Sequence, residues 1–312
     1  MNSRSPLLTI ITPAYNAEDF ISETINSVLE ARIPVEYEYL VINDGSKDGT
    51  GNILKSFDNR IRYFEHANIG ESKTVNRGIE LAAGKYILVI NADDPLFSPD
   101  LIINGINLLE SDEEIAAVYP DWRMIDTHGK QLKNVIVPEF SMELLLGMLR
   151  SLPGPGTLFR SDLAKEIGGR NPKWKYVSDY DFWLRLSTKG KIVHLPGILA
   201  QWRDHQNSAS TAHRGKEMAL ERVNVIEDFL SDNEVSNSLA SMALGNAYYM
   251  SARLAYFDSS IPGRRLLIRS FILRKRWVEQ AKFHIVMYLL LLPLSRFIVS
   301  HIPNLDSRIR EK

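Results

Sequence analysis

From residue 39 to residue 50 the chain reads YLVINDGSKDGT, an apolar run that passes directly into a turn rich in Gly, Ser and Asp. The run Tyr39–Asn43 is typical of a buried strand, and the turn that follows opens a helical pattern. A second apolar run, Leu7–Thr12, and a helical pattern, Ala17–Arg32, precede it. Continuous apolar strands separated by helices predict a parallel sheet that is buried on both faces.

The rest of the chain extends this pattern. Further strands are predicted at Ile61–Phe64, Tyr86–Ile90, Ala116–Tyr119, Val135–Val137 and Lys191–Leu195. Helices are predicted at Glu71–Ala83, Met142–Leu149, Asp162–Ile167 and Tyr180–Thr188, and from Lys216 to the end. The predicted fold class is therefore α/β, with a Rossmann-like, mostly parallel sheet flanked by helices and a helical C-terminal extension.

Composition narrows the class of protein. The 312 residues are 45% hydrophobic and 24% charged, with a net charge of -1, which is ordinary for a globular protein. The absence of cysteine excludes disulfides, a thiolate nucleophile and Cys-ligated metal centres, and it fits a reducing cytoplasm. The apolar run at Leu7 stops at Pro13, so we expect no secretion signal.

The charge is unevenly distributed along the chain. Residues 261–312 carry eleven Lys and Arg against three acidic side chains, a net charge of +8, whereas the preceding residues carry -9. This basic tail is a candidate for contact with anionic membrane headgroups, and a solvated helical surface is the plainer alternative. Its apolar run Ile285–Leu292 is interrupted by Pro293 and is shorter than the ~20 residues of a spanning helix, so an interfacial or buried helix is expected.

Four polar clusters follow predicted strands or open a helix. They are Thr12–Asn16 (TPAYN), Asn43–Thr50 (NDGSKDGT), Asn91–Pro95 (NADDP) and Ser178–Arg185 (SDYDFWLR). Parallel sheets bind ligands at the carboxyl ends of their strands, where the first three clusters are expected to lie. The adjacent acids of the third suit Mg²⁺ or Mn²⁺ on a diphosphate, and an acid of the fourth is a candidate general base. The plainer alternatives are turns, a helix cap from Asp94 and acids at a helix N-terminus.

Taken in this order, together with Asn68-Ile69-Gly70, the four clusters resemble family 2 of the GT-A glycosyltransferases over Leu7–Ser210. The resemblance implies a GT-A domain over residues 1–212, with a nucleotide-binding part at about 1–110 and an acceptor-binding part at about 111–212. Residues 213–312 then form a helical, basic region that is a candidate for membrane association. The implied reaction is inverting transfer of a sugar from a UDP-sugar to an acceptor hydroxyl, with a divalent cation, Mn²⁺ or Mg²⁺.

The resemblance also implies roles for single residues. Asp179 matches the base that deprotonates the acceptor, and Asp44 matches the acid that reads the nucleotide base. Asp93 matches the last acid of the metal-binding DxD motif, and His205 matches a position close to the diphosphate or the metal. The full donor-binding set is Thr12, Pro13, Ala14, Tyr15, Asn16, Asp44, Gly45, Ser46, Lys73, Asn76, Asn91, Ala92 and Asp93.

The chain departs from the family pattern at two acidic positions. Asn91 stands where the first acid of the DxD motif usually lies, and it can bind a ribose or a metal only as a neutral group. Ser178 replaces the acid that often precedes the base, which makes Asp181 a rival to Asp179.

A third departure removes a positive charge. Where the family often has Ala-Arg-Asn, this chain has Thr74-Val75-Asn76, so a cation that could meet phosphate is missing. Lys73 or Arg77 is a candidate substitute.

Three functional hypotheses follow. In the first, the basic tail holds the enzyme at the inner face of the cell membrane, where it glycosylates a lipid-linked glycan in polysaccharide biosynthesis. In the second, the acceptor is soluble or a protein, and the tail is a packing or dimer element. In the third, the chain is a non-catalytic partner in a polysaccharide-assembly complex. A dinucleotide-binding dehydrogenase is not expected, because no Gly-x-Gly-x-x-Gly follows the first strand, and the tail has no nucleic-acid-reading motif.

Overall fold

The computed structural model describes residues 5–57, 59–205, 216–254 and 260–273. By its internal contacts the chain divides into two compact units. The first contains residues 1–145 and 150–212, and the second contains residues 146–149 and 213–312. Each unit is described separately below.

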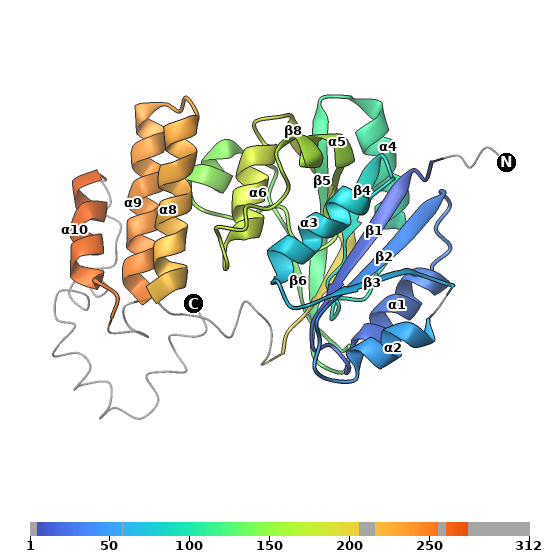
Figure 1. The fold of residues 1–312 in the computed structure, drawn as a ribbon. Helices are drawn as coiled ribbons and strands as arrows, with labels where there is room; N and C mark the ends of the chain where they lie inside the picture. The colour runs from blue at the N-terminus through green and yellow to red at the C-terminus, as the bar shows by residue number, and fades with distance from the viewer. Residues whose placement is uncertain (1–4, 58, 206–215, 255–259, 274–312) are drawn as a thin grey trace. The chain divides into compact units, whose positions relative to one another are not determined.

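The first unit is built on an eight-stranded sheet with the order β3-β2-β1-β4-β7-β5-β6, in which β8 also pairs with β5. The strands are β1 (Leu8–Ala14), β2 (Tyr37–Asp44), β3 (Arg62–His66), β4 (Tyr86–Val89), β5 (Ile115–Ile125), β6 (Gln131–Val135), β7 (Leu158–Arg160) and β8 (Lys191–Arg203). Strands β1 to β4 are parallel to their neighbours in that group, whereas β7 is antiparallel to both β4 and β5. The α/β class with a largely parallel sheet is confirmed (Figure 1).

Helices flank this sheet. In the first unit they are α1 (Ile21–Glu30), α2 (Thr50–Ser56), α3 (Glu71–Leu81), α4 (Asp100–Ser111), α5 (Ser161–Glu166) and α6 (Ser178–Leu186). The second unit contains α8 (Lys216–Asp232), α9 (Asn237–Leu254) and α10 (Gly263–Leu273). None of the helices among the described residues is long and apolar enough to cross a lipid bilayer.

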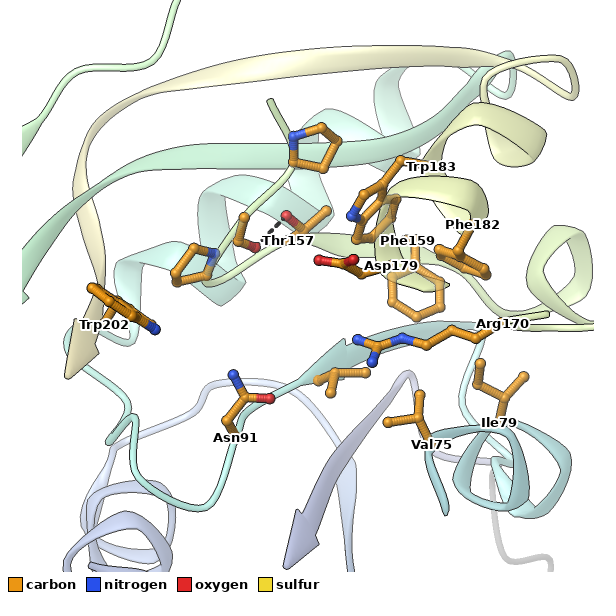
Figure 2. Close-up of a pocket in the computed structure, with 14 residues that line it drawn as sticks. Val75, Ile79, Asn91, Thr157, Phe159, Arg170, Asp179, Phe182, Trp183 and Trp202 are labelled. Atoms are coloured by element: carbon orange, nitrogen blue, oxygen red, sulfur yellow. Dashed lines mark hydrogen bonds between the residues drawn. The ribbon is translucent and has the colours of Figure 1, made fainter. Parts of the chain in front are cut away.

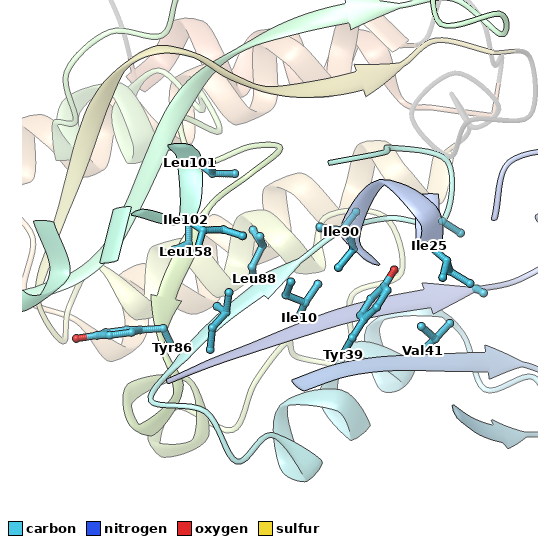
Figure 3. Close-up of a cluster of buried hydrophobic side chains, with 14 of the residues drawn as sticks. Ile10, Ile25, Tyr39, Val41, Tyr86, Leu88, Ile90, Leu101, Ile102 and Leu158 are labelled. Carbon is cyan, nitrogen blue, oxygen red and sulfur yellow. The ribbon is translucent and has the colours of Figure 1, made fainter. Parts of the chain in front are cut away.

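Strand β1 is buried along its whole length because helices pack on both sides of it. On one side Ile10 belongs to a core cluster with Ile25 of α1 (Figure 3). On the other side α3 packs so closely that a Cβ built on Gly78 would lie 2.6 Å from Cγ2 of Ile11. This two-sided burial explains why the strand reads as a continuous apolar run and not as an alternating one.

Several elements differ from the prediction. Helix α4 and the three-residue β7 are additional elements, and β8 continues to Arg203, well beyond Leu195. Residues Glu143–Gly147 form a π-helix, where an α-helix was expected over Met142–Leu149. Asp94 does not cap the following helix, because α4 begins at Asp100 and Pro99 occupies its N-cap. The predicted helix at Ile285–Leu292 lies outside the described residues.

Candidate active site

The first two polar clusters meet because β1 and β2 end side by side, with Ala14 opposite Asn43 in the register. Asn16 then holds the loop after β2 through two bonds. Its backbone N–H donates to Ser46 Oγ at 3.0 Å, and its Oδ1 accepts from the backbone N–H of Lys47 at 2.8 Å. These bonds fix the two loops as one surface at the carboxyl edge of the sheet, where ligands bind in this class of fold.

Asp44, at the end of β2, organises a third loop. Its carboxylate is 3% exposed and accepts hydrogen bonds from the backbone N–H groups of Ile69 and Gly70, at 2.7 and 3.0 Å. The close approach requires glycine at position 45, where φ is +66° and a Cβ would lie 2.5 Å from the backbone nitrogen of Asn68. His66 Nδ1 lies 3.4 Å from Oδ1, so Oδ2 is the oxygen that keeps a second acceptor site for a donor from a ligand.

The predicted stretch Thr12–Asn16 has a buried part and an exposed part. Thr12, Pro13 and Ala14 are buried inside β1, and the hydroxyl of Thr12 lies 3.0 Å from the Tyr39 hydroxyl. Their side chains therefore pack in the core, and a contact of these three residues with the nucleotide through their backbone stays a prediction. The exposed part of the stretch is Asn16 together with Tyr15, whose ring is 47% exposed.

Asp93 and His205 come together from positions 112 residues apart. His205 Nε2 lies 2.8 Å from Asp93 Oδ2, and both side chains are partly accessible to solvent. The His205 ring also packs on Phe20, with ring centroids 5.0 Å apart. Among the described residues there is no group of three or more His, Asp or Glu side chains placed to hold a metal ion. The described residues therefore offer a carboxylate and an imidazole to a cation.

Asp94 points away from this pair and is buried. Its carboxylate accepts the backbone N–H of Arg203 at 2.7 Å and the side-chain amide of Asn91 at 3.0 Å. Burial raises the pKa of Asp94 to about 8, and the neighbouring charge of Asp93 adds to the rise. The two adjacent acids thus have different surroundings, and Asp93 is the one exposed to a ligand.

A cavity of about 200 Å³ opens beside Asn91 (Figure 2). One wall is aliphatic, with Val75, Ile79 and Val89, and another is aromatic, with Phe159, Phe182 and Trp183. Its volume is below the ~300–1,000 Å³ of sites for drug-sized ligands, so it suits one sugar ring better than a whole sugar nucleotide. The ionisable side chains in its lining are Asp179 and Arg170.

The two candidate bases on α6 have contrasting surroundings. Asp179 is exposed, lines the cavity, and accepts a hydrogen bond from the backbone N–H of Tyr180 at 2.7 Å. Asp181 is buried, and its Oδ2 accepts from Nε and Nη2 of Arg185 at 2.8 and 2.6 Å. Asp181 does not line the cavity. Ser178, which stands where the family often has an acid, bonds to Ser72 of α3 at 2.7 Å.

Two cations on α3 were expected to replace the missing family arginine at the phosphates. Lys73 is exposed on α3, and Arg77 lies over the Phe64 ring at 5.9 Å. Neither lines the cavity, and a contact of either with phosphate stays a prediction. Asn76, predicted to bind the donor, bonds instead to the backbone of Arg170: its Nδ2 donates to the carbonyl oxygen and its Oδ1 accepts the N–H, both at 2.7 Å. Arg170 itself enters the cavity, and nothing in its sequence context GGRNP marked it as functional.

The loop before Arg170 allows a test of the two hydrogen bonds between the Asn76 side chain and the Arg170 backbone, which we call the Asn76 clamp. Gly168 and Gly169 both have positive φ, +74° and +68°, but a Cβ on Gly169 would lie 2.4 Å from Asn76 Oδ1, whereas a Cβ on Gly168 would meet nothing within 4 Å. We expect Gly168→Ala to reduce the free energy of unfolding by about 1 kcal/mol, from backbone strain alone. Gly169→Ala should cost roughly 1–3 kcal/mol more, because it also breaks the clamp. Denaturant titration of both variants measures the difference, and equal losses would show that the clamp contributes nothing.

Comparisons with known proteins identify the family of the chain. The family model described as "Glycosyl transferase family 2" matches residues 9–168. An uncharacterized glycosyltransferase of Rickettsia felis is 32% identical over 219 residues, which cover 67% of this chain and 36% of that protein. Chondroitin synthase of Pasteurella multocida is 30% identical over 238 residues, which cover 75% of this chain and 24% of that protein. The chain thus spans well under half the length of these two relatives.

Solved structures share the fold. Residues 1–349 of S. aureus TarS, in complex with UDP-GlcNAc, superpose with a TM-score of 0.66 at 16% identity, covering 85% of this chain and 79% of that one. The mannosyltransferase PcManGT of Pyrobaculum calidifontis, in complex with GDP-Man and Mn²⁺, gives a TM-score of 0.55 at 16% identity, covering 95% and 88%. These similarities confirm the GT-A type of fold. With the family match over half of its residues, the chain belongs to glycosyl transferase family 2.

Proposed function

We propose that the enzyme transfers a sugar from a UDP-sugar to an acceptor hydroxyl with inversion of the anomeric centre. The observation that carries the proposal is the cavity between Asn91, beside the metal-binding motif, and Asp179. A donor whose diphosphate lies at Asp93 would extend its sugar into this cavity. Tyr15, which is exposed, and Asp44, whose carboxylate is buried at the end of β2, would face the nucleotide at the other end of the donor.

Asp179 supplies the chemistry of the transfer in this proposal. Its carboxylate accepts the proton of the acceptor hydroxyl while the hydroxyl oxygen bonds to C1 and the bond from C1 to the phosphate oxygen breaks. A mechanism with retention would require a second carboxylate as nucleophile on the other face of the sugar. Among the described residues that line the cavity, Asp179 is the single carboxylate, which favours direct displacement and inversion.

Asp93 and His205 fit a divalent cation such as Mn²⁺, because they present an accessible carboxylate and an imidazole nitrogen 2.8 Å apart. When bound, the cation would neutralise charge that develops on the leaving diphosphate. Arg203 and Thr24 bond to the backbone of this loop. Arg203 Nε donates to the Asp93 carbonyl oxygen, and the Thr24 hydroxyl donates to the Ala92 carbonyl oxygen. Ala92 thus supports the loop through its backbone and is buried.

The matched variants Asp93→Asn and Asp94→Asn test this assignment. We expect Asp93→Asn to weaken Mn²⁺-dependent binding of UDP at least tenfold, because it removes the charged ligand. Asp94→Asn should change it less than twofold, since an amide oxygen can still accept the Arg203 N–H and the buried site disfavours a charge. Calorimetric titration with UDP, with and without Mn²⁺, gives both values, and the reverse order would move the metal site to Asp94.

We further propose that a lipid-linked glycan is the acceptor and that the second unit contacts the inner face of the cell membrane. Helix α10 supports this. Its inner face buries Leu266 and Leu267, whereas its outer face exposes Arg265 and Arg269 beside Ile268, which is 54% exposed. A helix face that combines cations with exposed apolar side chains suits an anionic lipid surface.

Charge reversal tests the membrane contact. We expect Arg265→Glu/Arg269→Glu to reduce binding to vesicles containing phosphatidylserine more than tenfold, because each cation near such a surface contributes about 1 kcal/mol. The control Lys130→Glu/Lys133→Glu makes the same change of charge at exposed positions of the first unit and should leave binding within about threefold. Vesicle sedimentation at two salt concentrations measures both, and equal losses would show a general charge effect with no role for α10.

Transfer itself is tested with radiolabelled sugar nucleotides and membrane vesicles. We expect label from a UDP-sugar to appear in a lipid product that is extracted into organic solvent, and label from GDP-mannose not to be transferred. Label found in water-soluble products alone would contradict the lipid acceptor.

A further inference from the structure

The guanidinium of Arg170 projects into the cavity from the loop between α5 and α6, towards the space between Asn91 and Asp179 (Figure 2). Its side chain is 14% exposed. Among the described residues that line the cavity it is the single cation. The aliphatic and aromatic side chains around it offer no hydrogen-bond acceptors, and its ion pair with Glu71 lies outside the cavity lining.

The loop that carries Arg170 is held firmly on two sides. Asn76 of α3 forms the pair of bonds with the Arg170 backbone described above. From α6, Arg185 donates from Nη1 to the carbonyl oxygen of Ile167 at 2.6 Å, and from Nη2 to that of Gly169 at 2.7 Å. The guanidinium therefore extends from a fixed backbone, as a preorganised binding group requires.

Within the described residues, the Arg170 guanidinium uses only part of its capacity to donate hydrogen bonds. Its Nη1 donates to Glu71 Oε1 at 2.7 Å, and Glu71 is 53% exposed and does not line the cavity. A guanidinium has five N–H donors, so a single bond to one carboxylate oxygen leaves most of them for another acceptor. No ion pair links Arg170 to Asp179 among the described residues, although both line the same cavity.

We propose that Arg170 binds a carboxylate of the transferred sugar, so that the donor is the nucleotide derivative of a hexuronic acid. This inference rests on the proposed function. The diphosphate is assigned to Asp93 and His205, which do not line the cavity, and Arg170 therefore faces the sugar end of the donor. A planar carboxylate matches the guanidinium in charge and in its two parallel acceptors, whereas a sugar hydroxyl matches neither.

The charge at this position also suits the reaction. A sugar carboxylate close to Asp179 would repel the charged form of the base, and Arg170 lies where it offsets that repulsion. A cavity with Asp179 and without Arg170 would therefore disfavour an acidic sugar.

The test compares binding of UDP, UDP-glucose and UDP-glucuronate, the last two differing at C6, by calorimetry with Mn²⁺. The wild type should bind UDP-glucuronate about 10- to 100-fold more tightly than UDP-glucose, the range expected for a charge-assisted pair. Arg170→Met should abolish this preference and leave the affinity for UDP itself within twofold. Arg170→Lys should keep a smaller preference, because lysine retains the positive charge but cannot donate two parallel hydrogen bonds to a carboxylate. Arg60→Met removes an arginine that lies outside the cavity, over the Phe57 ring, and should behave as the wild type.

Two outcomes would overturn the inference while the proposed function stands. One is equal binding of UDP-glucose and UDP-glucuronate by the wild type. The other is an Arg170→Met variant that loses affinity for UDP as strongly as for UDP-glucuronate. That result would show that the Arg170 guanidinium binds the diphosphate and not the sugar. Failure of the wild type to bind UDP at all would instead refute the proposed function.

Discussion

Asp179→Asn is expected to reduce sugar transfer by roughly 10²–10⁴-fold, the range for loss of a general base, and to leave the affinity for UDP within about twofold. The amide that replaces the carboxylate cannot take the acceptor proton. It does preserve the shape of the residue, and the one backbone bond that the carboxylate accepts, from Tyr180, needs only an oxygen. Initial rates at saturating donor, together with calorimetric titration of UDP, separate the chemical step from binding.

Asp181→Asn is the matched control, two residues further along the same helix. It weakens a buried pair with Arg185, so we expect a lower melting temperature but transfer per folded molecule within about fivefold of the wild type. If Asp181→Asn abolished transfer and Asp179→Asn did not, the base would have to be reassigned to Asp181.

Arg203→Met is expected to have the largest effect on stability. The Arg203 side chain is fully buried and donates to the carbonyl oxygens of Asp93, Asp126 and Thr127 and to the carboxylate of Glu23. Methionine fills much of the volume but leaves these acceptors without their donors. Removing a buried charged partner typically costs 3–5 kcal/mol, which in a unit of this size lowers the melting temperature by roughly 10 °C.

The same substitution should also loosen the metal-binding loop, since it removes the bond from Arg203 Nε to the carbonyl oxygen of Asp93. We expect Mn²⁺-dependent binding of UDP to weaken along with stability. Glu23→Gln is the control: its side chain is 54% exposed and the amide oxygen can still accept from Arg203, so the loss should stay below about 1 kcal/mol. Scanning calorimetry measures both variants. A melting temperature for Arg203→Met within about 2 °C of the wild type would show that the buried network is not essential.

The sequence predicted those parts of the fold in which pattern and burial agree. Strands β1, β2 and β4 are buried on both faces and read as apolar runs, and the polar clusters after them lie at one edge of the sheet, as topology requires. Strand β7 was missed because three residues carry no usable periodicity. The extension of β8 to Arg203 was missed because its pairing with β5 shifts register repeatedly, so no simple alternation survives.

The site shows a similar division. Asp44, Asp93 and Asp179 could be selected because each carboxylate directly follows a strand or opens a helix. Arg170 could not, because its placement depends on a clamp from Asn76, which is 94 residues distant in the sequence. Adjacent residues of a strand point to opposite faces, and the sequence alone did not show that the Thr12 hydroxyl bonds to Tyr39 inside the core.

The central claim is that the sugar nucleotide binds at the carboxyl edge of the sheet, with its diphosphate at Asp93 and its sugar in the cavity beside Asp179. A crystal structure of the enzyme with UDP and Mn²⁺ tests this most directly. We predict density for the metal between Asp93, His205 and the diphosphate, with the uracil between Tyr15 and Asp44 and the cavity left open for the sugar. A nucleotide bound elsewhere, or a metal that contacts neither Asp93 nor His205, would contradict the account.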